Sequence, residues 1–194
     1  MVGGRQLVDL LLEPARFWRE RHDRPQTPIT LFVETALPLM MIRTAAVLLR
    51  SLLFGSLRPG LVLAVGSLAL QLGAWLGLAL VLPAIARQFY AELKDRDAHA
   101  LATYASVPIW LAGVFYLLPE EAWPVLLWSR LLVLVVGLYG LYILACGFAA
   151  LGIERKVVPG LVTAVGLAAV ILYVVLSLLL AVTAHVVIFV IGGS

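Results

Sequence analysis

The chain has 194 residues, of which 63% are hydrophobic and only 13% charged, and its formal net charge is +3. A soluble domain has roughly 45–50% apolar and about 25% charged residues, and no soluble core of this length buries so much apolar surface. Lipid must therefore be the solvent for much of the chain, and because no basic motif or stacking platform accompanies the charge, no nucleic-acid partner is predicted.

The first segment, residues 1–26, is amphipathic. Apolar and aromatic side chains recur at helical spacing over residues 4–24, and charged side chains fill the other face. This pattern is typical of a helix that lies in the membrane interface; the alternative is a helix packed on a soluble partner domain. We expect Phe17 and Trp18 to insert as anchors while Arg16 and Arg19 stay in water. Pro14 either kinks the helix or starts its second half.

The remaining chain, residues 27–194, is predicted to form one all-α membrane domain with five transmembrane helices, because a span needs roughly 20 apolar residues. The joints between the apolar segments are short, so no linker separates two domains. The last apolar segment is too long for one upright span, so it tilts, protrudes, or breaks near Thr183. The expected spans are residues 28–49, 61–84, 100–118, 123–148 and 158–185.

The distribution of basic residues predicts the orientation in the membrane. With the N-terminus inside, ten Lys and Arg residues lie in the cytoplasmic segments, and only Arg58 lies in an outer loop. Basic residues accumulate in cytoplasmic loops, so the N-terminus should be cytoplasmic and the C-terminus outside. The chain has 12 Arg, 2 Lys and no Asn, a bias that favours a GC-rich bacterial genome and hence the cytoplasmic (inner) membrane.

Polar side chains within the spans are the candidate site. Glu34 and Arg43 lie about 9 Å and about 22 Å into the first span and are turned by about half a revolution, so they cannot pair with each other. Gln71 lies near the middle of the second span, and Arg130 enters the fourth from the outside. A charge in hydrocarbon costs roughly 2.5–3.5 kcal/mol on insertion scales, so we expect these side chains to face the bundle interior.

Two interpretations of this polar interior remain open. One is structural ion pairing between helices; the other is a hydrated cavity for an ion, a lipid headgroup or an anionic solute. Small residues at Gly66, Gly73 and Gly77, and again at Gly137, Gly140 and Gly147, allow close helix contacts, either within the chain or between two copies.

Two stretches, "TYASVPIWLAG" from Thr103 and "VGLYGLYILACGFAAL" from Val136, together with the head "LLEPARFWRERHDRP", point to a family. With these features the chain resembles the Yip1-domain family over roughly residues 7–180. The resemblance implies a five-helix membrane domain with a cytoplasmic N-terminus, and the family's eukaryotic members are linked to Rab GTPases and vesicle traffic. The residues that carry the match are Tyr104, Ala105, Pro108, Gly113, Gly137, Tyr139, Gly140, Tyr142 and Gly147.

No enzymatic motif occurs: the sequence contains no GxSxG, Walker loop, GxGxxG, HExxH or CxxC. We therefore predict a non-enzymatic protein without cofactor or metal. The first functional hypothesis is a membrane scaffold that binds lipid, in particular anionic lipid, or a membrane-protein partner or second copy of itself. The alternative is a small transporter or channel for an ion or anionic solute through the polar interior, and flux into liposomes separates the two.

Overall fold

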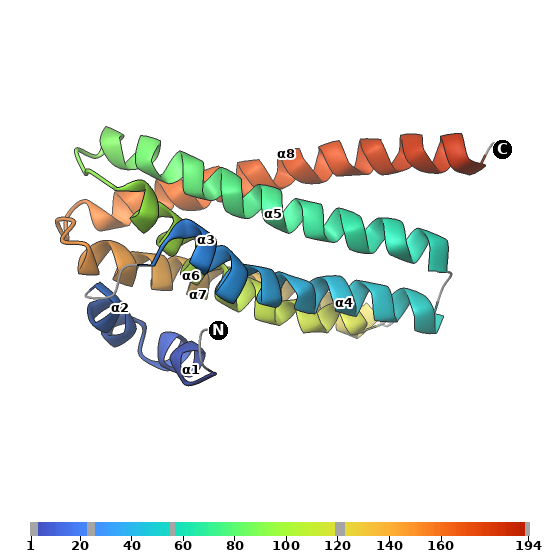
Figure 1. Ribbon diagram of the computed structural model, residues 1–194, viewed down its shortest axis with the longest axis horizontal. Coiled ribbons are helices and arrows are strands. Elements are labelled where there is room, and N and C mark those ends of the chain that lie inside the picture. The colour runs from blue at the N-terminus through green and yellow to red at the C-terminus, as the bar shows by residue number, and fades with distance from the viewer. Residues whose placement is uncertain (1–3, 23–25, 55–56, 119–122, 193–194) are drawn as a thin grey trace.

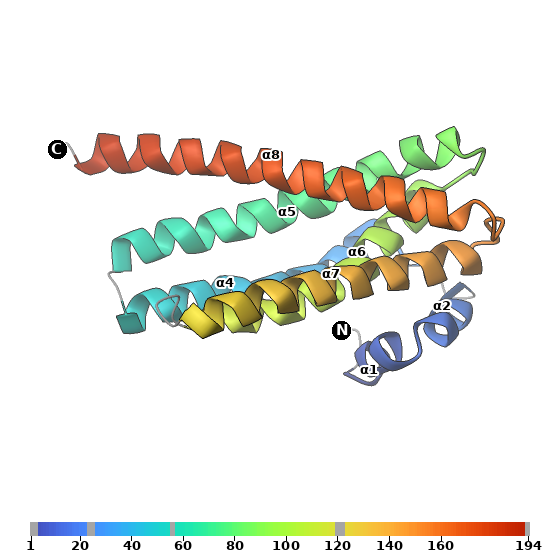
Figure 2. The same cartoon turned by 180° about the vertical axis from the view of Figure 1, so that it is seen from behind.

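A computed structural model describes residues 4–22, 26–54, 57–118 and 123–192; the side chains of residues 22, 58–59, 123–130, 133 and 184–192 lie outside this description. Within these ranges every regular element is a helix. Long helices form a bundle, and two short helices lie against one end of it (Figures 1 and 2). The elements are α1 (Gly4–Leu12), α2 (Pro14–His22), α3 (Pro28–Leu31), the π-helix η1 (Phe32–Ala36), α4 (Leu37–Phe54), α5 (Leu57–Gln88), α6 (Asp95–Leu111), the 3₁₀-helix η2 (Ala112–Leu117), α7 (Trp123–Ala150) and α8 (Val158–Gly192).

Four helical segments are long and apolar enough to cross a membrane: Pro28–Phe54, Gly60–Gln88, Asp95–Leu117 and Val158–Thr183. They coincide with the first, second, third and fifth expected spans. The expected fourth span, residues 123–148, lies within α7, of which the stretch Leu134–Ala150 qualifies as a shorter apolar helix in the described part of the chain. The expected all-α membrane architecture is therefore present, with four candidate membrane-spanning helices.

The first apolar segment is continuous in direction but not in helix type. Pro38 has no backbone N–H and cannot bond to the carbonyl of Glu34. The turn before it widens into the π-helix η1, in which the N–H of Leu37 reaches Phe32 O, five residues back. A proline-linked π-turn of this kind shifts the faces of α3 and α4 relative to each other.

Helices α5 and α8 pack through small residues. A Cβ atom built on Gly66, Gly73 or Gly77 of α5 would meet a leucine side chain of α8 in each case. The three leucines that fill these positions are Leu180, Leu176 and Leu172. The small-residue stripe of α5 therefore serves contacts within the chain, in keeping with close packing of membrane helices. Helix α8 runs without a break past Thr183, so of the three alternatives for the last segment a break is excluded.

The N-terminal helices α1 and α2, which we call the cap, lie at the end of the bundle that also holds the α5–α6 and α7–α8 connections (Figures 1 and 2). Pro14 begins α2, as a proline at the first helical position can. The expectation that Phe17 and Trp18 insert into lipid needs correction, since their side chains are only 7% and 4% exposed and belong to the core of the protein. The apolar face that carries them packs against α6 and α7 and not against lipid.

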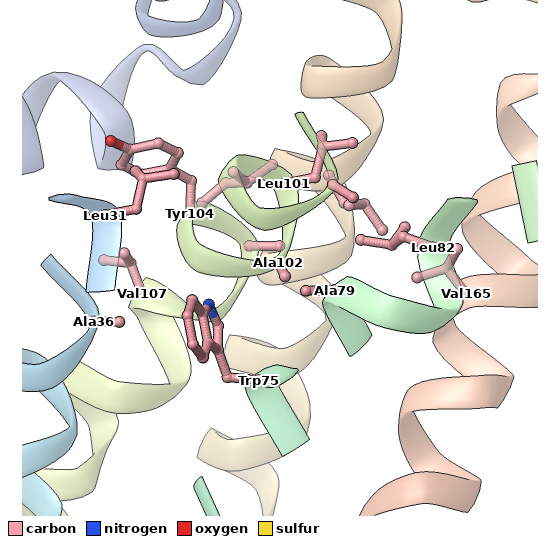
Figure 3. Close-up of a cluster of buried hydrophobic side chains, with 14 of the residues drawn as sticks. Leu31, Ala36, Trp75, Ala79, Leu82, Leu101, Ala102, Tyr104, Val107 and Val165 are labelled. Carbon is pink, nitrogen blue, oxygen red and sulfur yellow. The ribbon is translucent and has the colours of Figure 1, made fainter. Parts of the chain in front are cut away.

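The core lies between the cap and the middle of the bundle. Figure 3 shows buried side chains from four segments converging there. They come from the first apolar segment (Leu31, Ala36), α5 (Trp75, Ala79, Leu82), α6 (Leu101, Ala102, Tyr104, Val107) and α8 (Val165). In a bilayer such contacts stabilise by van der Waals packing more than by removal from water.

Candidate functional site

Arg43 lies on α4, where this helix passes very close to η2. A Cβ atom on Gly113 would lie 2.5 Å from Arg43 Cβ and 3.0 Å from Arg43 Cα, so glycine is required for this approach. Along the chain, Tyr116 follows Gly113 by one 3₁₀ turn, and the Arg43 guanidinium carbon lies 4.3 Å from its ring centroid. This is a cation–π contact. Arg43 Nε is buried and has no hydrogen-bond partner among the described residues.

Gln71 reaches from α5 to α4 next to Arg43. Its side chain is 5% exposed, and its Nε2 donates to Ser67 O at 3.1 Å and to Met40 O at 3.3 Å. Met40 lies one turn before Arg43 on the same helix. The amide oxygen Oε1 of Gln71 is buried and accepts no hydrogen bond in the described part of the chain. An unsatisfied buried polar atom is uncommon and calls for an explanation such as a ligand.

Arg43 and Gln71 line a cavity of about 480 Å³ among α4, α5, α6, η2, α7 and α8. Most of its wall is apolar, and the other polar contributors are the side chains of Ser106, Tyr116 and Tyr173. The volume falls within the roughly 300–1,000 Å³ of small-molecule sites, which combine apolar walls with a few polar groups. The described lining residues provide one cationic group, one free amide acceptor and an apolar chamber, which are suited to binding. No nucleophile–base pair occurs among these described residues.

Glu34 lies away from this cavity. It is half-buried in η1, toward the cap, and interacts electrostatically with Tyr104. The structure thus brings together two of the four candidate residues, Arg43 and Gln71, and leaves Glu34 apart. The fourth, Arg130, belongs to α7, but its side chain lies outside the described residues.

A second polar cluster, which the sequence analysis did not identify, lies under the cap. The guanidinium carbon of Arg21 lies 4.7 Å from the ring centroid of Tyr104 and 6.0 Å from that of Phe17. Burial lowers the pKa of Arg21, and its Nη2 has no partner among the described side chains. The sequence spacing could have indicated this cluster. Arg21 is three residues after Trp18 and four after Phe17, so it shares their helix face.

The cap is held to the bundle by directed contacts. Trp18 Nε1 donates a hydrogen bond to Ile143 O at 3.1 Å, and Tyr139 Oη donates to Leu11 O at 2.5 Å. The rings of Phe17 and Trp18 meet Tyr104 edge to face at centroid distances of 4.9 and 5.5 Å. By contrast, Arg16 is exposed and paired with Glu20 at 2.8 Å. Arg19 is exposed too.

Several residues that resemble the family motif, among them Gly140 and Gly147, serve helix contacts. A Cβ on Gly140 would lie 2.5 Å from Ala105 O, so α6 and α7 cross at backbone contact there. Gly147 faces Trp18 and Leu101, and Gly137 faces open space at the cavity wall. Pro108 is buried within α6, and Tyr142 is exposed beside Tyr139. The motif therefore describes how α6, α7, η2 and the cap fit together.

The family model described as Yip1 domain matches residues 8–192, nearly the whole chain. Neither the curated proteins nor the solved structures contain a match. The predicted resemblance is confirmed: the chain belongs to the Yip1 domain family.

Proposed function

We propose that the protein is a non-enzymatic, five-span membrane scaffold that binds lipid or a membrane-protein partner. The observation that carries this proposal is the packed core between the cavity and the cap. On α5, Gln71 is followed toward the cap by Trp75, Ala79 and Leu82, each at most 5% exposed. Their neighbours from α6, including Leu101 and Ala102, are fully buried (Figure 3).

This core favours a binding protein over a conduit. A transporter or channel needs a hydrated path with polar groups along it, whereas the cavity at Arg43 is closed toward the cap by close-packed apolar side chains. The indole of Trp75 is fixed in this core, because its Nε1 donates to Thr103 Oγ1 at 2.9 Å. Among the residues that the structure describes, no feature specifically favours the transport alternative.

The cap supplies a surface for interaction. Its buried face is fixed to the bundle, and its outer face presents Arg16, Arg19 and the acidic partners Glu13 and Glu20. If the basic segments are cytoplasmic, as their distribution predicts, this face lies at the inner surface of a bacterial cytoplasmic membrane. Basic side chains there attract anionic headgroups.

Flux into proteoliposomes tests the scaffold against the transport alternative. We expect K⁺, Cl⁻ and a small fluorescent anion to enter vesicles that contain the protein no faster than they enter empty vesicles. An ionophore added at the end of each run shows that the vesicles are sealed. Entry above the background that disappears in Arg43→Leu would replace the scaffold by a transporter.

A further inference from the structure

The cavity at Arg43 combines three features that a membrane lipid requires. The wall contains a guanidinium group, most of the rest of the wall is apolar, and the chamber is large enough for part of a small amphiphile. We propose that it binds one membrane lipid with an anionic headgroup, the phosphate meeting Arg43 and an acyl chain filling the apolar part. The proposal rests on the proposed function in taking lipid as the ligand, and it adds the site and the headgroup class.

Two buried polar atoms on residues that line the cavity lack a hydrogen-bond partner in the described part of the chain. The face of the guanidinium group is covered by Tyr116, but Arg43 Nε is buried without a hydrogen-bond partner among the described residues. A charged donor held in apolar surroundings favours an anionic acceptor, and Arg matches phosphate geometry well. Gln71 Oε1 lacks a donor, and the hydroxyl groups of a glycerol headgroup are donors of the required kind.

The shape of the bundle supplies a lateral entrance. Helices α7 and α8 diverge from their connection at the cap end (Figure 2). Leu134 and Leu138 of α7 and Val170 and Tyr173 of α8 line the cavity and are also exposed. The cavity therefore opens between these helices on a surface that faces lipid, and an acyl chain enters without leaving hydrocarbon.

Gly137 provides a way to fill the cavity without removing the charge. A Cβ atom at this position would meet nothing within 4 Å, and the residue lines the cavity. Leucine has a higher helix propensity than glycine, so Gly137→Leu should fold while its side chain occupies the acyl-chain space. Arg87→Leu is the matched charge control, because Arg87 is exposed at the end of α5 and outside the cavity wall.

The test is native mass spectrometry of the purified full chain equilibrated with phosphatidylglycerol or phosphatidylcholine at equal concentration. We expect one tightly retained phosphatidylglycerol, with roughly tenfold lower retention in Arg43→Leu, since a hydrogen bond to a charged group is lost. Gly137→Leu should lower it as well, and Arg87→Leu should leave it unchanged. Size-exclusion profiles and unfolding temperatures show whether each variant folds. If Arg43→Leu does not fold, the proposal is tested by Gly137→Leu and by the comparison of phosphatidylglycerol with phosphatidylcholine.

Equal retention of the two lipids, or unchanged retention of phosphatidylglycerol in folded Arg43→Leu or Gly137→Leu, would overturn the proposal. Displacement of phosphatidylglycerol by millimolar inorganic phosphate alone would also overturn it and identify a free-anion site. The liposome flux assay reports on the proposed function separately. A protein that conducts ions and still retains phosphatidylglycerol through Arg43 would refute the scaffold but leave the lipid site standing. A protein that conducts nothing and shows no selective retention would refute the lipid site but leave the scaffold standing.

Discussion

Two regions of the interior contain the same pair of residue types in different surroundings. Under the cap, Arg21 lies 4.7 Å from the Tyr104 ring, and in the middle of the bundle Arg43 lies 4.3 Å from the Tyr116 ring. Arg21 is half-buried against Phe17 and Tyr104, whose rings pack on each other, whereas Arg43 borders a cavity of about 480 Å³. An arginine–tyrosine pair is thus a packing contact under the cap and part of a candidate binding site where a cavity lies beside it.

The largest expected effect on stability concerns the region under the cap. Trp18→Ala removes a buried indole and its hydrogen bond to Ile143 O, and such truncations cost about 3–5 kcal/mol. We expect a corresponding loss of stability in detergent-solubilised protein, measured as a lower unfolding temperature. Trp18→Phe, which keeps most of the apolar contact, should be milder. No change in stability in Trp18→Ala would mean that the cap is not part of the folded core.

A smaller effect is expected where α4 meets η2. Gly113→Ala places a methyl group against the backbone of Arg43, and overpacking of this kind costs about 1–3 kcal/mol. The matched control is Gly137→Ala, where the same methyl group enters open space and removal of a helix glycine stabilises by up to about 1 kcal/mol. Thermal unfolding of both variants measures the difference, and equal shifts would contradict the close approach of α4 and η2.

Replacing each of the two arginines by an uncharged residue sharpens the comparison between the region under the cap and the cavity. Burial lowers the pKa of Arg21, which means that its charged form is disfavoured at this site. We therefore expect Arg21→Met to change stability by only about 1 kcal/mol, the loss of the cation–π contacts being offset by the relief of desolvation. It should leave phosphatidylglycerol retention unchanged, whereas Arg43→Met should reduce it. Loss of lipid retention in Arg21→Met would show that lipid binding does not distinguish the region under the cap from the cavity.

The last prediction assigns the two ends of the bundle, the cap end and the end opposite to it, to the two sides of the membrane. It involves no change in stability. In a Cys146→Ala background, Tyr90→Cys marks the α5–α6 connection and Leu118→Cys marks the opposite end, and both positions are exposed. The excess of basic residues at the cap end predicts that Cys at 90 is protected from an impermeant thiol reagent outside the cell and Cys at 118 is labelled. The opposite pattern would reverse the orientation.

Local properties of the sequence determined much of this protein. Hydropathy and length identified four candidate membrane helices, Pro14 indicated either a kink or the helix start that α2 shows, and the order of glycines and tyrosines indicated the family. Each depends on residues close together in the chain, since solvation by lipid and backbone geometry act over one helix at a time. Intramembrane charges marked Arg43 as a candidate for the same reason, because their cost is independent of the fold.

Only the tertiary structure decided what each marked residue touches. An amphipathic face requires an apolar surface, and lipid and helix α7 are equally apolar, so periodicity could not show that Phe17 and Trp18 pack on the bundle. The contact of Gln71 with α4 and the approach of Gly113 to Arg43 depend on the register of helices that are distant in sequence. That register follows from how all the side chains interlock, and it placed Arg43 beside a cavity and Arg21 against the rings of Tyr104 and Phe17.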